Sequence, residues 1–102
     1  MEKAPTNTSQ VRILKIITAL KGHTLTGLSN AEIAEAIKDS KVNVSRTLDV
    51  MITEGFAIKH ESGRFSLSQK VASIAMLTMM ELDQAQSKID EMKQRMYAGA
   101  QR

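Results

Sequence analysis

Residues Ser29–Gly55 read SNAEIAEAIKDSKVNVSRTLDVMITEG, two short amphipathic segments separated by a polar break. Ser29 is a preferred N-cap residue, and Glu32 follows three positions later, which is the pattern of a capping box. Ser40 stands at the break and can cap the second segment, which ends at Gly55. The stretch therefore predicts two helices joined by a tight turn, a helix-turn-helix.

The second of these predicted helices has one apolar and one polar face. Its apolar residues recur at i, i+4, i+7 and i+8, which predicts one buried stripe made of Val44, Leu48, Met51 and Ile52. The second helix of a helix-turn-helix commonly enters the major groove of DNA, and its N-terminal residues reach the base edges. We therefore expect DNA contacts from Lys41, Asn43, Ser45, Arg46 and Thr47.

Each of these side chains also has a plain alternative. Arg46 lies opposite the buried stripe, where it can pair with guanine or hold a phosphate, or simply be a solvated arginine. Asn43 can read adenine through its amide, or it can make a local capping bond near Ser40. Ser29 is first of all a helix cap, and its hydroxyl can also meet a phosphate at the helix start.

Closer to the N-terminus, Thr8 or Ser9 can cap a first helix that runs to about Lys21, where Gly22 can end it. Its apolar residues cover two adjoining faces, so we expect heavy burial of Val11, Ile13, Leu14, Ile16, Ile17 and Leu20. Residues 1–8 are expected to form a flexible arm. The connector His23–Leu28 has room for a short β segment.

On the C-terminal side of Gly55, a turn in which Gly63 can take a positive φ is flanked by two short runs, Phe56–His60 and Arg64–Leu67. Alternation predicts an inward face made of Phe56, Ile58, Phe65 and Leu67. Three helices followed by a hairpin make a winged helix-turn-helix over residues 9–67. The wing carries three more candidate DNA contacts, Lys59, His60 and Arg64, although an exposed hairpin with ordinary charges is the alternative.

Residues 68–102 predict one long helix, from Gln69 to about Ala98, because they contain no proline and no early glycine. Residues of a coiled-coil seam recur in it with alternating steps of four and three. We therefore expect this helix to form a homodimer, with its contacts made by Val71, Ala75, Thr78, Leu82, Ala85, Ile89, Met92 and Met96. The fold class is then mainly α with a small β-hairpin, a winged helix-turn-helix followed by a long C-terminal dimerisation helix.

Composition excludes several other classes of protein. The chain has 102 residues, 42% of them hydrophobic, which suffices for one modest core. It has no cysteine, no apolar run of about 18 residues and no signal-peptide pattern, so we expect a cytoplasmic protein without membrane contact. The net charge of +3 is too small to argue for nucleic acid by itself. No motif of a catalytic, metal or cofactor site is present, so we expect no enzyme and no cofactor.

The chain from Val11 to about Val71 resembles the N-terminal DNA-binding domain of the IclR family of bacterial transcription regulators. The resemblance rests on RILKIITAL, LSNAEIAEAI, VSRTLDVMITEGFA and GRFSLSQKV, taken in that order. Proline usually precedes the recognition helix in that family, whereas Ser40 and Lys41 stand there in this chain. Family members usually continue into a larger effector-binding domain, and this sequence continues into one long helix, so no small-molecule effector is expected.

The resemblance implies a sequence-specific transcription regulator that binds double-stranded DNA. A two-fold dimer predicts a pseudo-palindromic site, and a short dimeric protein of this kind is similar to repressors of phages, plasmids or other mobile elements. One alternative is an architectural, segregation, replication or recombination accessory protein with the same fold. Another is a winged-helix module that binds protein and not DNA.

Overall fold

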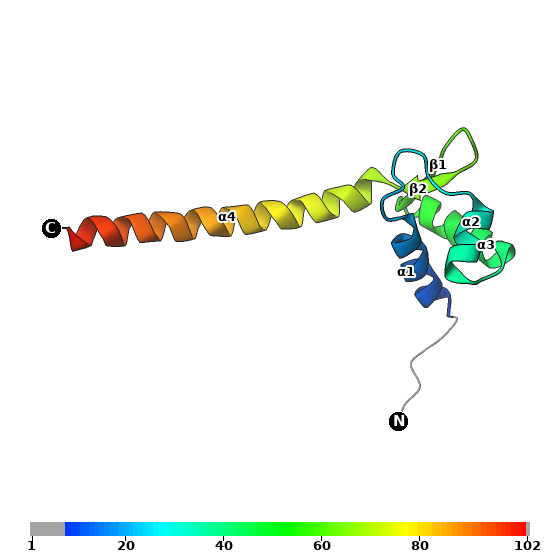
Figure 1. Ribbon diagram of the computed structural model, residues 1–102, viewed down its shortest axis with the longest axis horizontal. Helices are drawn as coiled ribbons and strands as arrows, with labels where there is room; N and C mark the ends of the chain where they lie inside the picture. Colours follow the sequence, from blue (N-terminus) through cyan, green and yellow to red (C-terminus); the bar gives the residue numbers. More distant parts are fainter. Residues whose placement is uncertain (1–7, 102) are drawn as a thin grey trace, which may run out of the picture. The chain divides into compact units, whose positions relative to one another are not determined.

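The computed structural model describes residues 8–101, which form four helices and one two-stranded sheet. In chain order the elements are α1 (Ser9–Leu20), α2 (Asn30–Ile37), α3 (Lys41–Thr53), β1 (Ala57–Lys59), β2 (Phe65–Leu67) and α4 (Gln69–Ala100), labelled in Figure 1. The chain divides into two compact units, Met1–Val71 and Ala72–Arg102. The expectation of a mainly helical protein with a small hairpin and a long last helix is confirmed. The arm predicted for residues 1–8 lies, apart from Thr8, outside the described residues.

The predicted helix starts in the first unit are confirmed by their caps. The Thr8 hydroxyl accepts a hydrogen bond from the backbone N–H of Val11 at 3.1 Å. Ser29 and Glu32 form the complete capping box of α2, in which each side chain accepts from the other's backbone N–H. The Ser40 hydroxyl accepts from the N–H of Asn43 at 3.1 Å. Each cap satisfies a backbone donor that the first helical turn leaves without a partner.

The core of the first unit lies where α1, α2, α3 and β1 meet. Its buried apolar side chains come from all four elements: Ile16, Leu20, Ile33, Ala34, Val44, Leu48, Met51 and Ala57. Two sequence expectations are wrong at its edge, because Leu14 is 65% exposed and Ile52 is 36% exposed. Both lie at the margin of an otherwise correct stripe, since the small core covers only one side of each helix.

The hairpin faces the core differently from the prediction. Ile58 was expected to point inward, yet it is 45% exposed, whereas Ala57 is 2% exposed. Residues directly opposite each other in an antiparallel pair share a face, and the register decides which ones do. The pairs are Ala57 with Leu67, Ile58 with Ser66, and Lys59 with Phe65. Ile58 therefore lies on the face opposite to that of Phe65 and Leu67, which pack against the core, and it is exposed although its partner Ser66 is fully buried.

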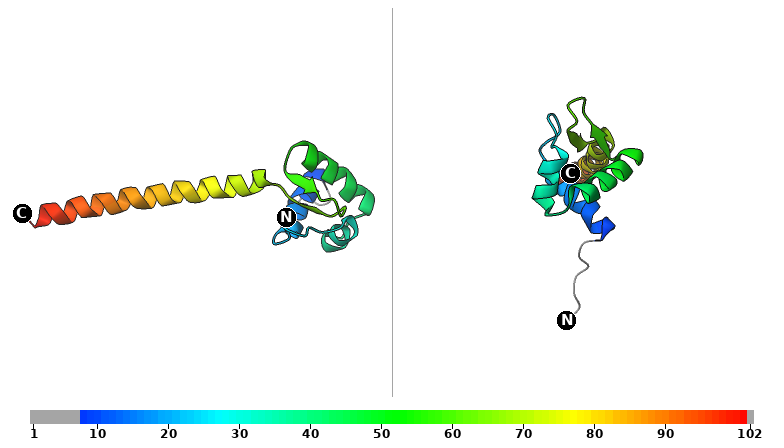
Figure 2. Two further views of the ribbon diagram at one scale, coloured as in Figure 1. Left: turned by 90° about the horizontal axis from the view of Figure 1, so that it is seen from above. Right: turned by 90° about the vertical axis from the view of Figure 1, so that its right-hand side faces the viewer.

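The connector between α1 and α2 lies beside the hairpin (Figure 2). Leu28 forms an isolated antiparallel bridge with Phe65, with both backbone hydrogen bonds at 2.8 Å. Gly27, at φ +71°, lets the two backbones approach, because a Cβ there would lie 2.5 Å from the carbonyl oxygen of Phe65. This bridge realises the short β segment expected in the connector and fixes the hairpin to the helical part of the first unit.

The second unit consists of the α4 residues after Val71, and none of its side chains is buried. The predicted helix is confirmed and ends at Ala100, two residues later than expected. Large apolar side chains along it are about half exposed or more, between 48% at Ile89 and 69% at Tyr97. In the part of the chain that the structure describes, no helix combines the length and hydropathy needed to cross a membrane.

Candidate nucleic-acid interface

The first half of α3 presents an outward face made of side chains that can contact DNA. Lys41, Ser45 and Arg46 are exposed, as the sequence predicts. Val42 is 58% exposed beside them and offers an apolar surface of the kind that meets a thymine methyl group. Since Val44 and Leu48 are fully buried on the opposite side, the helix is anchored by one face and free to meet a ligand with the other.

Two predicted contacts on α3 are used inside the protein. Thr47 is only 6% exposed, and its hydroxyl donates to the carbonyl of Asn43 at 2.9 Å. Asn43 is half-buried, and its amide donates to the Asp39 carboxylate at 2.9 Å. Thr47 thus uses its hydroxyl proton inside the protein, although it lines an open hollow together with Arg46, and a DNA contact by Thr47 stays a prediction. The backbone N–H of Asn43 donates to the capping hydroxyl of Ser40, and its side-chain amide donates to Asp39. These bonds match the local role near Ser40 that the sequence offered as the alternative to reading adenine.

Asp39 holds the start of α3 against α1. Its carboxylate accepts from the guanidinium of Arg12 at 2.7 Å, from the Asn43 amide, and from the backbone N–H of Ser40 at 2.7 Å. These bonds favour the charged form and lower the pKa of Asp39 from 3.8 to about 2, with the Arg12 bond as the largest cause. The charge of Arg12 is matched by Asp39 in this way, and the pair positions the start of α3 against α1.

An open hollow of about 520 Å³ lies between the start of α2, the start of α3 and the hairpin. Four of the predicted DNA contacts line it together, Ser29, Lys41, Ser45 and Lys59. They come from three elements that are distant in the sequence, which only the fold brings together. Two of them are lysines, so the hollow suits an anionic group such as a backbone phosphate.

Asn30 ties two walls of this hollow to each other. Its amide donates to the Lys41 carbonyl at 3.2 Å and to the Ser45 hydroxyl at 2.6 Å. Because Ser45 accepts this bond, its own hydroxyl proton remains to be donated outward, toward a phosphate oxygen or a base acceptor. The sequence interpretation missed Asn30, since its partners lie 11 and 15 residues away and no local pattern marks them.

A second, smaller hollow of about 270 Å³ lies on the other side of α3, between it and α1. Arg46 lines it, together with Arg12 and Val50 among others. Arg12 is paired with Asp39, whereas Arg46 takes part in neither of the two ion pairs found in the described residues. Arg46 is therefore the cation that this side of α3 can offer to a ligand.

The three candidate DNA contacts on the hairpin differ in how far their polar groups are free to bind an external ligand. Lys59 is exposed, with its ammonium 5.7 Å from the ring centre of Phe65. His60 is half-buried, and its Nε2 lies 2.9 Å from the hydroxyl of Ser66. Arg64 was expected to face DNA, but it holds the connector. Lys59 is thus the wing side chain best placed to meet an external anion.

The contacts of Arg64 explain this change of role. Its guanidinium donates to the carbonyl of Thr26 at 3.1 Å and to that of Gly27 at 3.0 Å. It also forms an ion pair with Glu32 at 2.9 Å. The pKa of Glu32 is lowered, first by the backbone bond from Ser29, then by that residue's hydroxyl, and further by Arg64. Arg64 thus joins the hairpin, the connector and the capped start of α2.

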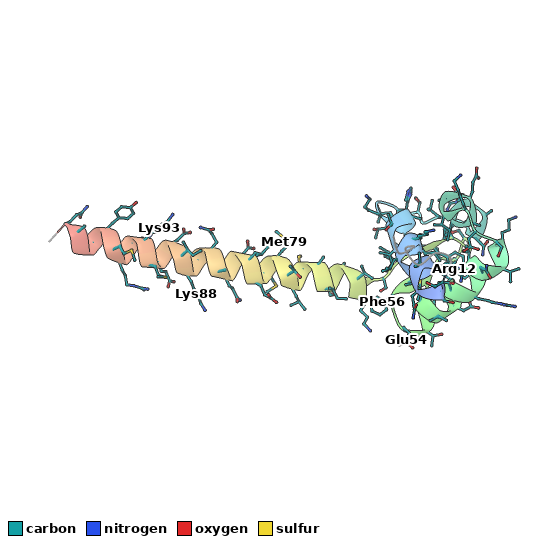
Figure 3. The ribbon with its side chains drawn as sticks, turned by 90° about the horizontal axis from the view of Figure 1, so that it is seen from below. Arg12, Glu54, Phe56, Met79, Lys88 and Lys93 are labelled. Atoms are coloured by element: carbon teal, nitrogen blue, oxygen red, sulfur yellow. The ribbon has the colours of Figure 1, made fainter. Side chains whose placement is uncertain are left out.

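The motif residues at the end of α3 have a structural role. The Lys70 ammonium donates to the carbonyl of Glu54 at 3.2 Å and lies 4.7 Å from the ring centre of Phe56. Gly55, at φ +85°, turns the chain beside the stem of Lys70. Glu54 and Phe56 lie at this end of α3 in Figure 3. The contacts of Lys70 with Glu54 and Phe56 therefore hold the end of α3 next to the beginning of α4.

The chain matches no protein-family model, and a search of curated proteins finds no match to it. Within residues 8–101, no group of three or more histidine, aspartate or glutamate side chains is placed to hold a metal ion.

Proposed function

We propose that this protein is a winged helix-turn-helix regulator similar to the IclR family, which binds double-stranded DNA as a homodimer. In this proposal α3 enters the major groove, and the hairpin follows the adjacent backbone. Repression follows when the bound protein occupies a promoter and blocks polymerase.

The observation that supports this proposal best is the hollow between α2, α3 and the hairpin. It gathers Lys41, Ser45 and Lys59, while the exposed Val42 and Arg46 lie elsewhere on α3, Arg46 in the hollow on the other side of the helix. Cations and hydroxyl donors suit phosphates, while an arginine and a small apolar side chain suit base edges.

The proposed homodimer is supported by the exposed seam of α4. Its larger members, Leu82, Ile89, Met92 and Met96, are between 48% and 67% exposed. A helix with a repeating apolar seam commonly buries it against another helix. Two copies also double the number of phosphate contacts, which matters because one copy contributes only a modest positive charge.

Selection of bound sequences from random double-stranded DNA tests the proposal. We expect an enriched pseudo-palindromic sequence, bound about 1,000-fold more tightly than random DNA at physiological salt. Equal affinity for both would favour an architectural or accessory DNA-binding protein, and absence of binding would favour a protein-interaction module.

Two variants then separate the predicted roles. Lys41→Ala should weaken binding to all sequences alike and reduce the slope of log affinity against log salt by about 1. Arg46→Ala should relax specificity at one base position if it contacts guanine. Lys15→Ala is the matched control, because Lys15 is an exposed cation that lines a different groove, between α1 and α2. Equal effects of all three variants would contradict the proposed interface.

A further inference from the structure

The seam of α4 contains small and large residues in a regular order. The first four members are Val71, Ala75, Thr78 and Leu82, and the last four are Ala85, Ile89, Met92 and Met96. Thr78 belongs with the small apolar members, because its hydroxyl donates to the carbonyl of Ile74 within the helix at 3.2 Å. Large side chains therefore predominate toward the C-terminal end of the seam, and small ones toward its start.

We propose that α4 pairs with α4 of a second copy in antiparallel orientation. This inference rests on the homodimer proposed above, but not on DNA binding. The antiparallel register that aligns all eight seam positions places one small residue against one large residue in every layer. The layers are Val71 with the partner's Met96, Ala75 with the partner's Met92, Thr78 with the partner's Ile89, and Leu82 with the partner's Ala85.

A parallel pair in register would fill the seam much less evenly. It would place Ala75, Thr78 and Ala85 each against its own copy, and each methionine against a methionine. Alanine layers leave voids between helices, while methionine layers hold the helices apart, and the two effects conflict along one straight pair. The antiparallel pair keeps the side-chain volume of the layers nearly constant, as close packing requires.

The charges beside the seam favour the same orientation. One side of the seam is flanked by Glu81 and Lys88, and the other by Met79 and Lys93; Figure 3 shows Met79 and Lys93 on one side of α4 and Lys88 on the opposite side. In a parallel pair Lys88 would lie beside the partner's Lys93, a contact between like charges. In the antiparallel pair Glu81 lies beside the partner's Lys88, and the symmetry gives two such attractions. Neither Glu81 nor Lys88 belongs to an ion pair in the described residues of one copy.

This orientation sets the distance between the two copies of Val71, the residue at which the proposed DNA-binding unit of each copy joins the rest of α4. The two copies of Val71 lie about 25 residues apart along the helix axis, or ~38 Å at ~1.5 Å per residue. One turn of DNA, the commonest spacing of half-sites, measures about 34–36 Å. A parallel pair would instead bring the two copies of Val71 within ~10 Å of each other.

Distances between spin labels on the full-length protein test the orientation directly. The chain has no cysteine, so Gly99→Cys provides a single label per copy, and a Cβ at Gly99 meets nothing within 4 Å. The antiparallel pair predicts about 31 residues between the two labels, or ~46 Å. Gln84→Cys is the matched control, because Gln84 lies at the centre of the seam and gives a short distance in either orientation. A short distance from Gly99→Cys would overturn the inference and leave the proposed dimer intact, whereas a monomer would overturn both.

Charge-reversal variants test the orientation independently, with the dimer affinity of the full-length protein measured by sedimentation. Lys88→Glu should weaken the antiparallel dimer by about tenfold, because two attractions become repulsions. The double variant Glu81→Lys with Lys88→Glu should restore the affinity. In a parallel pair Lys88→Glu would meet the partner's Lys93 and tighten the dimer, so a tighter dimer would refute the antiparallel arrangement.

Discussion

Substitution of Gly27 by alanine should detach the connector from the hairpin. Gly27 has φ +71°, and a Cβ there would lie 2.5 Å from the Phe65 carbonyl oxygen and 3.0 Å from its carbon. Backbone atoms cannot rotate away as a flexible side chain can. The connector must therefore move, and the hydrogen bonds that Leu28 and Phe65 exchange at 2.8 Å are the first contacts to be lost.

The loss of unfolding free energy in Gly27→Ala is the sum of two separate costs. Alanine in the left-handed region costs about 1–2 kcal/mol relative to glycine. Loss of two backbone hydrogen bonds adds about 2 kcal/mol, at about 1 kcal/mol each. Gly22→Ala isolates the first cost, because Gly22 has φ +83° and nothing within 4 Å of an added Cβ. The difference of about 2 kcal/mol between the two variants corresponds to roughly 10 °C in the melting temperature of a domain of this size.

Thermal unfolding of both variants, followed by circular dichroism, measures this difference. Amide hydrogen exchange at Leu28 and Phe65 makes the measurement local, because α4 contributes much of the helical signal. We expect fast exchange at both amides in Gly27→Ala and protected amides in Gly22→Ala. Equal losses of stability in the two variants, or protected amides in Gly27→Ala, would refute the proposed role of this close approach.

Three further predictions concern single side chains. The pKa of Asp39 is lowered to about 2, so its contribution to stability is complete above about pH 5 and is lost as pH falls toward 2; urea unfolding of wild type and Asp39→Asn between about pH 6 and about pH 2 should show their difference shrinking below about pH 5. Leu48→Ala should cost about 3 kcal/mol in the same measurement at neutral pH, whereas Ile52→Ala should cost less than about 1 kcal/mol, since Leu48 is fully buried and Ile52 is 36% exposed. Arg64→Ala should lower stability but leave the salt dependence of DNA affinity unchanged, because its guanidinium is held by the connector carbonyls and a carboxylate; a smaller salt slope in a titration would show that it contacts phosphate.

Helix boundaries in this protein were predictable because their signals are local. The hydroxyls of Thr8, Ser29 and Ser40 each accept from a backbone N–H three residues later, so acceptor and donor lie in one short stretch of sequence. Gly55 and Gly63 take the positive φ expected of them for the same reason. The outward faces of α3 at Lys41 and Arg46 follow from helical periodicity alone.

Errors arose wherever the outcome depended on a distant partner. Ile58 shares a face with Ser66 and not with Phe65 or Leu67, and this register is a property of two strands. Arg64 is occupied by carbonyls 37 and 38 residues earlier in the chain. Thr47 resembles its exposed neighbours in sequence, and only the packing of α3 against α1 buries it.

The elements, their caps and the apolar seam of α4 are each encoded within a few residues of chain, so local patterns were enough to predict them. Which polar side chains remain available depends on the fold, because Lys59 from the hairpin and Lys41 from α3 share one hollow only after folding. The guanidinium of Arg64, for example, donates to carbonyls of the connector, and nothing local in the sequence records that use.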